Sequence, residues 1–166
     1  NNGPLVIANT KRVTPEILES YLFGVENNDG VVTKIGIIEQ AHKGTLYIDE
    51  ICNLNKNLQA RFVKLLTEKT INRVAGKYNI NIDIRLLVGT SSNIHDEIKK
   101  NNFREDLFYR LNVVPIEIPS LNERIDDIPE LVDYFIKICC ENIGVSQLIM
   151  PKEGYSYLQS RKWNGN

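Results

Sequence analysis

Four apolar runs occur in the first 120 residues, and each is followed by polar or turn-forming residues. Their apolar residues stand mostly at successive positions, which is typical of strands buried on both faces of a parallel sheet. The runs are residues 5–8, 45–48, 82–90 and 113–118, and Pro115 inside the last favours an edge strand. The pattern predicts an α/β fold with a parallel sheet covered on both faces.

Segments with helical spacing separate these runs and follow them. Thr14 is placed to cap the first helix and Pro15 to begin it, and Gly24 is placed to end it. The predicted helices are residues 15–23, 35–42, 56–69, 94–100, 103–111, 128–142 and 151–163.

Two stretches carry turn chemistry instead of helical spacing. Residues 25–34 have Asn-Asn-Asp-Gly at their centre and are predicted to be a loop. Residues 70–74 are predicted to be a short hairpin strand with its turn at 75–79. Because only helices are predicted beyond the fourth apolar run, we predict two domains, residues 1–120 and residues 121–166.

Composition and charge narrow the functional classes only slightly. The chain has 166 residues, 42% hydrophobic and 25% charged, with a net charge of −1, which predicts a globular protein without a general attraction to nucleic acid. The sequence has no apolar run of 18 residues and no signal peptide, so we predict no membrane partner and a cytoplasmic location. Three cysteines, two of them adjacent, indicate reduced thiols, and the absence of CxxC argues against zinc.

The candidate chemistry begins with an acidic pair, Asp49 and Glu50, directly after the second apolar run. Ligands of open α/β sheets collect at the carboxyl ends of the strands. Adjacent carboxylates on a strand point to opposite faces, so one acid can hold Mg²⁺ while the other positions an attacking water. A solvated turn between strand and loop is the alternative interpretation of the same two residues.

Two arginines flank a short predicted helix further along the chain. Arg104 and Arg110 are six residues apart, so helical geometry does not place them on one stripe. They are either ligands for an anion or ordinary surface charges.

Several segments, in order, resemble one known family. They are FG (23–24), EQAHKGTLYIDEI (39–51), LQARFVKLL (58–66), RVAGK (73–77), DIRLLVGTS (83–91), FREDLFYRLNVVPIEIPSLNER (103–124) and DDIPELVDYF (126–135). Together they resemble the central AAA+ ATPase domain of sigma-54-dependent bacterial transcription activators, over almost the whole chain. The resemblance implies a P-loop NTPase-type three-layer sandwich at 1–120 and the start of a small helical lid at 121–166.

The family's ATP-hydrolysing residues match positions of this chain. By resemblance, GTLYIDE is the Walker B strand, in which Asp49 coordinates Mg²⁺–ATP and Glu50 orients the hydrolytic water. Asn9 matches the switch asparagine that pairs with that glutamate. The implied cofactors are ATP and Mg²⁺.

Further matches concern phosphate sensing and the neighbouring subunit. Thr90 and Ser91 lie where the family carries sensor I, with Ser91 in place of the usual asparagine, which implies altered sensing of the γ-phosphate. Arg104 and Arg110 match the arginine fingers, which act on the nucleotide of a neighbouring subunit. The resemblance therefore implies self-association into a ring, a hexamer or a dimer.

Several family features are missing from the printed sequence. It contains no Walker A loop, GxxxxGK[ST], and does not begin with Met, so we expect a chain cut from something longer, whose central P-loop strand lies upstream. We expect these residues alone to bind ATP poorly. Residues 163–166, Trp-Asn-Gly-Asn, resemble the family's WPGN with Asn164 in place of proline, which implies a truncated lid.

The loop after FG-x-E also departs from the family. It reads VENNDGVVTKIG and lacks GAFTGA, the motif that touches sigma-54, as in NtrX-type response regulators of nitrogen-sensing two-component systems. This argues against direct remodelling of RNA polymerase sigma-54, and it implies a sensor histidine kinase and DNA as partners of domains outside this chain. A non-enzymatic oligomerisation module, or the remnant of a split regulator gene, is the alternative.

Overall fold

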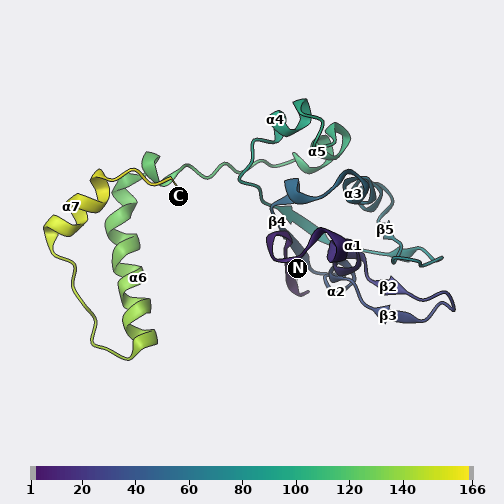
Figure 1. The fold of residues 1–166 in the computed structure, drawn as a ribbon, viewed down its shortest axis with the longest axis horizontal. Helices are drawn as coiled ribbons and strands as arrows, with labels where there is room; N and C mark the ends of the chain where they lie inside the picture. The colour runs from purple at the N-terminus through teal and green to yellow at the C-terminus, as the bar shows by residue number, and fades with distance from the viewer. Residues whose placement is uncertain (1–2, 165–166) are drawn as a thin grey trace. The chain divides into compact units, whose positions relative to one another are not determined.

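The computed structural model describes residues 3–164, so Gly165 and Asn166 of the terminal Trp-Asn-Gly-Asn run lie outside it. The chain divides into two units, Asn1–Val114 and Pro115–Asn166. Figure 1 shows an α/β arrangement in the first unit and helices in the second.

A three-stranded parallel sheet forms the centre of the first unit. Its strands are β1 (Leu5–Asn9), β4 (Thr45–Asp49) and β7 (Arg85–Val88), in the order β1-β4-β7. Ile7 pairs with Tyr47, and Tyr47 pairs with Leu87 on its other side. The predicted α/β class and parallel sheet are confirmed, and β4 is the central strand, so its carboxyl end lies between those of its neighbours.

Helices α1 (Pro15–Phe23), α2 (Ile37–Gln40) and α3 (Lys56–Glu68) pack on one face of this sheet (Figure 1). The Asn55 side chain caps α3 by accepting a hydrogen bond from Leu58 N at 2.9 Å, as its sequence position predicts. The shared core consists of fully buried residues from strands and helices: Ala8, Leu22, Phe23, Ile38, Leu46, Ile48, Leu58 and Phe62.

The opposite face of the sheet carries exposed apolar side chains. Leu5, Ile7 and Leu87 are exposed there by 66%, 57% and 43%. The described residues therefore supply the sheet and the helical layer on one side of it, and the third layer of the expected sandwich is not among them.

Residues 25–34, predicted to be a loop, instead form a short antiparallel hairpin. Its strands are β2 (Val25–Glu26) and β3 (Val32–Lys34). Asn27 Oδ1 accepts hydrogen bonds from the backbone N–H groups of Asp29 and Val31, at 3.1 and 2.8 Å. The turn was recognisable in the sequence, but the flanking strands are too short to show a periodic pattern.

A second hairpin pairs β5 (Thr70–Ile71) with β6 (Ile80–Asn81), as predicted for this region. Between them, Arg73 forms ion pairs with Glu26 at 3.2 Å and with Glu39 at 2.6 Å. All three side chains are largely buried, so the guanidinium offsets two carboxylates that would otherwise be costly to desolvate. Arg73 thereby ties the loop of the second hairpin to β2 and α2.

After β7 the chain forms α4 (Ile94–Lys99) and α5 (Glu105–Leu111). The fully buried Gln59 of α3 joins this region to the core. Its Nε2 donates to the carbonyl oxygens of Leu54 at 2.6 Å and Asn102 at 2.9 Å, and its Oε1 accepts from Arg104 N at 2.8 Å. Gln59 thus fixes the backbone at the start of α5.

The predicted strand at 113–118 is wrong. Val113, Val114, Ile116 and Ile118 are exposed by 72–85%, and these residues have no regular structure. Pro115 removes one N–H donor, and no strand among the described residues lies beside the segment to accept or donate backbone hydrogen bonds. Apolar composition alone therefore does not make this segment a strand.

The second unit is helical, as predicted. It contains the 3₁₀ turns η3 (Leu121–Glu123) and η4 (Ile125–Asp127), followed by α6 (Ile128–Ile143) and α7 (Lys152–Ser160). Gly144 ends α6 at φ 75°, a left-handed conformation that glycine adopts without strain. Within the described range, we find no helix with the length and apolarity needed to cross a membrane.

Candidate functional site

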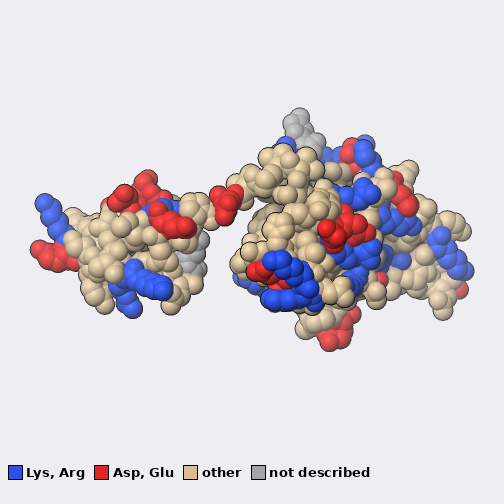
Figure 2. All heavy atoms as spheres, turned by 90° about the horizontal axis from the view of Figure 1, so that it is seen from above, with Lys and Arg blue, Asp and Glu red and all other residues tan. Residues whose placement is uncertain are grey.

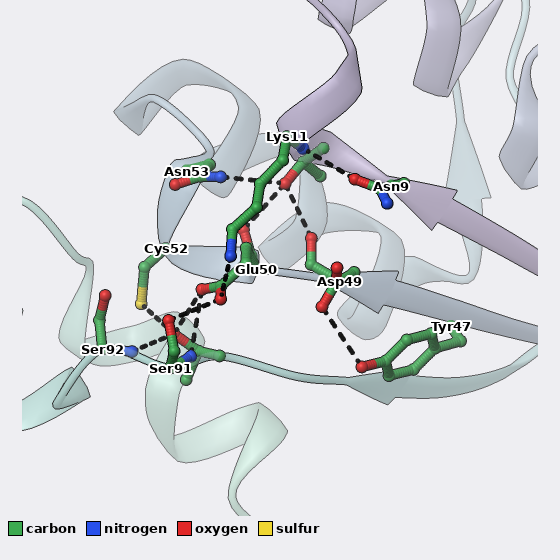
Figure 3. A network of polar contacts seen from close by, with 11 residues as sticks. Asn9, Lys11, Tyr47, Asp49, Glu50, Cys52, Asn53, Ser91 and Ser92 are labelled. Carbon is green, nitrogen blue, oxygen red and sulfur yellow. Dashed lines mark hydrogen bonds and ion pairs between the residues drawn. The ribbon is translucent and has the colours of Figure 1, made fainter. Parts of the chain in front are cut away.

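The carboxyl end of β4 carries both acidic candidates in different backbone conformations. Asp49 ends the strand, whereas Glu50 has φ 56° and ψ 64°, the left-handed region that non-glycine residues seldom adopt. Such a conformation costs about 1–3 kcal/mol and persists only where the surroundings hold it. The turn at Glu50 directs its side chain away from that of Asp49, toward the end of β7 (Figure 3).

Thr10, buried at the start of η1 (Thr10–Arg12), supports this strained turn. Its Oγ1 lies 2.8 Å from the Asp49 carbonyl oxygen and 3.1 Å from the Glu50 carbonyl oxygen. Asn53 Nδ2 in turn donates to Thr10 Oγ1 at 3.3 Å. One hydroxyl therefore links the end of β1 to the backbone of both acids.

Replacing Thr10 with valine, which has the same shape, is expected to destabilise the protein by roughly 1–3 kcal/mol, because buried carbonyl groups lose their donor. Thermal unfolding of the full-length protein measures the change. Thr33→Val serves as the control, since the Thr33 hydroxyl donates to Val25 O at 3.2 Å in an exposed hairpin. Equal melting temperatures for the two variants would contradict the assigned role of Thr10.

Glu50 is buried, and its carboxylate is surrounded by donors that follow both neighbouring strands. Its Oε1 accepts from Ser91 Oγ at 2.6 Å and lies 2.8 Å from Lys11 Nζ. Its Oε2 accepts from Ser91 N at 3.1 Å, with Thr90 Oγ1 at 3.4 Å. Figure 3 shows Lys11 reaching Glu50 from the side opposite to Ser91.

These contacts control the charge of Glu50. Burial by itself would raise the pKa of Glu50, but the hydrogen bonds from Lys11 and Ser91, with the charge of Lys11, outweigh it and lower the pKa to about 2. The hydrogen bond to Glu50 likewise raises the pKa of Lys11. The carboxylate is therefore ionised at neutral pH and acts only as an acceptor.

Asp49 has a more open environment. Its Oδ1 accepts a long hydrogen bond of 3.5 Å from the Tyr47 hydroxyl, which occupies the space beside Gly89. Burial, then the charge of Asp49, raises the pKa of Tyr47. No cluster of three or more His, Cys, Asp or Glu side chains occurs in the part that the structure describes. A single accessible carboxylate suits Mg²⁺ that is also bound by phosphate oxygens and water, because Mg²⁺ uses few protein ligands.

The structure thus brings Glu50, Thr90 and Ser91 together beside Asp49. Asn9 ends β1 next to this group, but its Oδ1 accepts from Lys11 N at 3.2 Å and caps η1. It is not among the residues that contact Glu50, and its role as a switch stays a prediction.

The two arginine candidates lie apart from this network. Arg104 precedes α5, and its guanidinium binds the carboxylate of Asp106 at 2.7 and 2.9 Å. Arg110 lies in the last turn of α5 with an exposed side chain. Neither residue contacts Asp49 or Glu50. In Figure 2, basic and acidic side chains are intermixed over the visible face of the first unit, with no continuous field of one sign.

Sequence reasoning missed two residues of the site, Thr10 and Lys11. The available signal was their position directly after Asn9, at the carboxyl end of a strand predicted to lie in the same sheet as the acidic pair. Parallel strands bring such ends together, so a hydroxyl and an ammonium group there are candidates for contact with the acids.

Comparisons with known proteins agree with this arrangement. Residues 1–117 match the model of the sigma-54 interaction domain. The nitrogen assimilation regulatory protein NtrX of Azorhizobium caulinodans is 40% identical over 164 residues, which cover 99% of this chain and 36% of that protein. A putative NtrX-like response regulator of Rickettsia conorii is 41% identical over 165 residues, covering 99% of this chain and 35% of that protein.

Solved structures of NtrX are also similar to this chain. Crystal structures of NtrX from Brucella abortus in complex with ADP and with ATP each have a TM-score of 0.91 to this chain. The identity is 37%, over 99% of this chain and 36% of theirs. The chain spans about a third of the length of these relatives. With a parallel sheet of the same fold and a family match over most of its residues, the chain belongs to the sigma-54 interaction domain family and is an NtrX-like AAA+ domain.

Proposed function

We propose that this chain is the ATP-binding and ATP-hydrolysing domain of an NtrX-like two-component transcription regulator. The observation that carries the proposal is the pair of acids at the end of β4, whose side chains lie in different environments. Asp49 is accessible, whereas the Glu50 carboxylate is surrounded by hydrogen-bond donors. Two carboxylates in such different environments can perform two different tasks. The ADP and ATP complexes of Brucella NtrX support a nucleotide as the ligand of this family.

Each residue of the pair has a distinct role in the proposal. Asp49 helps to hold Mg²⁺, which when bound neutralises charge on the phosphates of ATP. Glu50 orients the attacking water through its carboxylate oxygens. Thr90 and Ser91 sense whether the γ-phosphate of ATP is present and convey this to Glu50, because both of their hydroxyls lie next to its carboxylate oxygens.

Arg104 and Arg110 act, in this proposal, on the nucleotide of a neighbouring copy. Both lie outside the network around Glu50, and the only ion pair of Arg104 among the described residues is the local one with Asp106. An arginine that reaches a transferring phosphoryl group stabilises its developing charge. The working form is accordingly a ring oligomer, a hexamer or a dimer, with residues 121–166 as part of a helical lid.

The partners of the whole protein follow from the same family. Because the sequence lacks GAFTGA in the β2–β3 hairpin, we propose that the domain serves assembly and nucleotide-dependent regulation rather than direct remodelling of sigma-54 polymerase. DNA and a sensor kinase would be bound by other domains, and the location is cytoplasmic.

A non-enzymatic assembly module is the second candidate. The observation that favours it is the saturation of Glu50, whose oxygens accept from Lys11 and Ser91 at 2.6–3.1 Å and leave little room for a water. ATP turnover separates the two candidates.

The full-length protein is expected to hydrolyse ATP with a requirement for Mg²⁺, and Asp49→Asn is expected to raise the Mg²⁺ concentration needed for half-maximal turnover by about tenfold or more. The reason is that a neutral amide replaces the carboxylate proposed to bind the cation. Phosphate release measured across a Mg²⁺ titration tests this. Asp29→Asn, in the exposed turn of the β2–β3 hairpin, is the matched control. An unchanged Mg²⁺ requirement in Asp49→Asn would rule out Asp49 as the ligand.

A further inference from the structure

Lys11 differs from the other donors to Glu50 in its origin and its exposure. It lies in η1, after β1, whereas Thr90 and Ser91 follow β7 on the other side of β4. The Lys11 side chain is 59% exposed, and the Glu50 side chain that it contacts is 8% exposed. Lys11 therefore covers the solvent side of a carboxylate that is otherwise enclosed (Figure 3).

The hydrogen bonds of Oε1 leave no acceptor site on that oxygen. A carboxylate oxygen has about two lone pairs, and Oε1 accepts from Ser91 Oγ at 2.6 Å and contacts Lys11 Nζ at 2.8 Å. Oε2 is bound by Ser91 N at 3.1 Å, and Thr90 Oγ1 lies 3.4 Å away, at the same distance as from Cys52 Sγ. A water that hydrogen-bonds to Oε1 must displace one of its two donors.

Lys11 is the donor that can leave most readily. Ser91 binds both Glu50 oxygens, through its N–H and its hydroxyl, so its departure would break two hydrogen bonds in an enclosed place. The ammonium group of Lys11 sits on a flexible four-carbon stem and gains hydration when it swings away. Only the Lys11 end of the pair is exposed, so water can solvate the ammonium group as soon as it moves away from Glu50.

We propose that Lys11 is a positioning residue that locks Glu50 in a resting arrangement, and that its departure opens the acceptor site on Oε1 that the attacking water occupies. The inference rests on the proposed role of Glu50 in ATP hydrolysis. The other titratable groups near Glu50 in residues 3–164 are Asp49, one residue earlier, Tyr47, and Cys52, whose thiol lies beside Thr90. Lys11 is the cation among them and hence the lock.

The test compares ATP turnover by the full-length protein and its Lys11→Met variant, which keeps an unbranched apolar stem but no donor. We expect kcat to rise by about fivefold, because Lys11 no longer competes with the attacking water for Oε1, with KM for ATP unchanged. Lys11→Arg keeps a cation and should stay near the wild-type kcat. Arg12→Met is the matched control, because this exposed neighbour in η1 forms no ion pair among residues 3–164.

A second measurement needs no nucleotide. In the ATP-free protein, Lys11→Met should lower the melting temperature, but it should cause no further loss in a Glu50→Gln background, since the ion pair is already broken there. Such non-additivity is the signature of direct contact. Equal effects of Lys11→Met in both backgrounds would show that Lys11 does not hold Glu50 and would overturn the lock.

The outcomes separate the lock from the proposed function. An unchanged or lower kcat in Lys11→Met, while Glu50→Gln is inactive, overturns the lock and leaves the ATPase assignment standing. A raised KM with unchanged kcat also overturns it, because Lys11 would then contact the nucleotide. If the wild type and Glu50→Gln turn over ATP equally, or no variant does, the proposed function fails and the lock fails with it.

Discussion

Replacing Glu50 with glutamine is expected to reduce ATP turnover by the full-length protein by roughly 10²–10⁴-fold, the usual contribution of a positioned acid–base group. The amide has one acceptor oxygen instead of two, and its NH₂ group would face a donor, either Ser91 N or Lys11 Nζ. Water can then no longer be oriented by a carboxylate. Phosphate release under saturating ATP and Mg²⁺ measures the loss.

Two controls accompany this measurement. Glu68→Gln alters an exposed carboxylate at the end of α3 and should leave turnover unchanged. Mixing Glu50→Gln subunits with Arg104→Ala subunits should restore part of the turnover, because an interface that joins the intact Glu50 to an intact Arg104 is then formed. Wild-type turnover by Glu50→Gln would refute the role of this glutamate.

The second large effect concerns Gln59. Gln59→Leu is expected to destabilise the protein by roughly 3 kcal/mol or more, because the carbonyl groups of Leu54 and Asn102 and the N–H of Arg104 each lose a partner. Each such unsatisfied buried group costs about 1–3 kcal/mol. The apolar side chain is similar in volume, so the loss comes from hydrogen bonding rather than from a cavity.

Hydrogen exchange gives the most local readout for Gln59. The Arg104 amide should exchange much faster in Gln59→Leu, because its acceptor has gone, and the melting temperature should fall by roughly 10 °C. Gln40→Leu is the control, since Gln40 is exposed and its hydrogen bond to Ile35 O is long, at 3.5 Å. Unchanged protection of the Arg104 amide would mean that Gln59 does not support the start of α5.

Much of the fold was predictable because its signals are local. The cap at Asn55, the stop at Gly24 and the apolar run at 45–48 depend on neighbouring residues, and the structure has each of them. The two errors have different causes, strands too short to show a pattern and a missing neighbouring strand. The 25–34 hairpin needs only short strands around its turn, and residues 113–118 have strand composition but no neighbouring strand.

In the candidate site, too, some residues could be found from local sequence, whereas their contacts depend on how the strands pair. The acidic pair could be found from its place after a strand, and Thr90 and Ser91 from theirs after another. Which donor would reach Glu50 could not be read from the sequence, because Lys11 is 39 positions away and its reach depends on the pairing of β1 with β4. The left-handed turn at Glu50, which aims its carboxylate, likewise has no marker in the residue type.

Arg73 has a mechanical consequence for the two hairpins of the first unit. Besides its ion pairs with Glu26 and Glu39, the adjacent Val74 accepts from Glu26 N and donates to Gly24 O, each at 3.0 Å. The loop of the β5–β6 hairpin is therefore joined to β2, at one end of the β2–β3 hairpin, through Arg73 and Val74. Displacing the β5–β6 loop would therefore require the ion pairs with β2 and α2 to break together, so the loop, the hairpin and the helix keep one another in place.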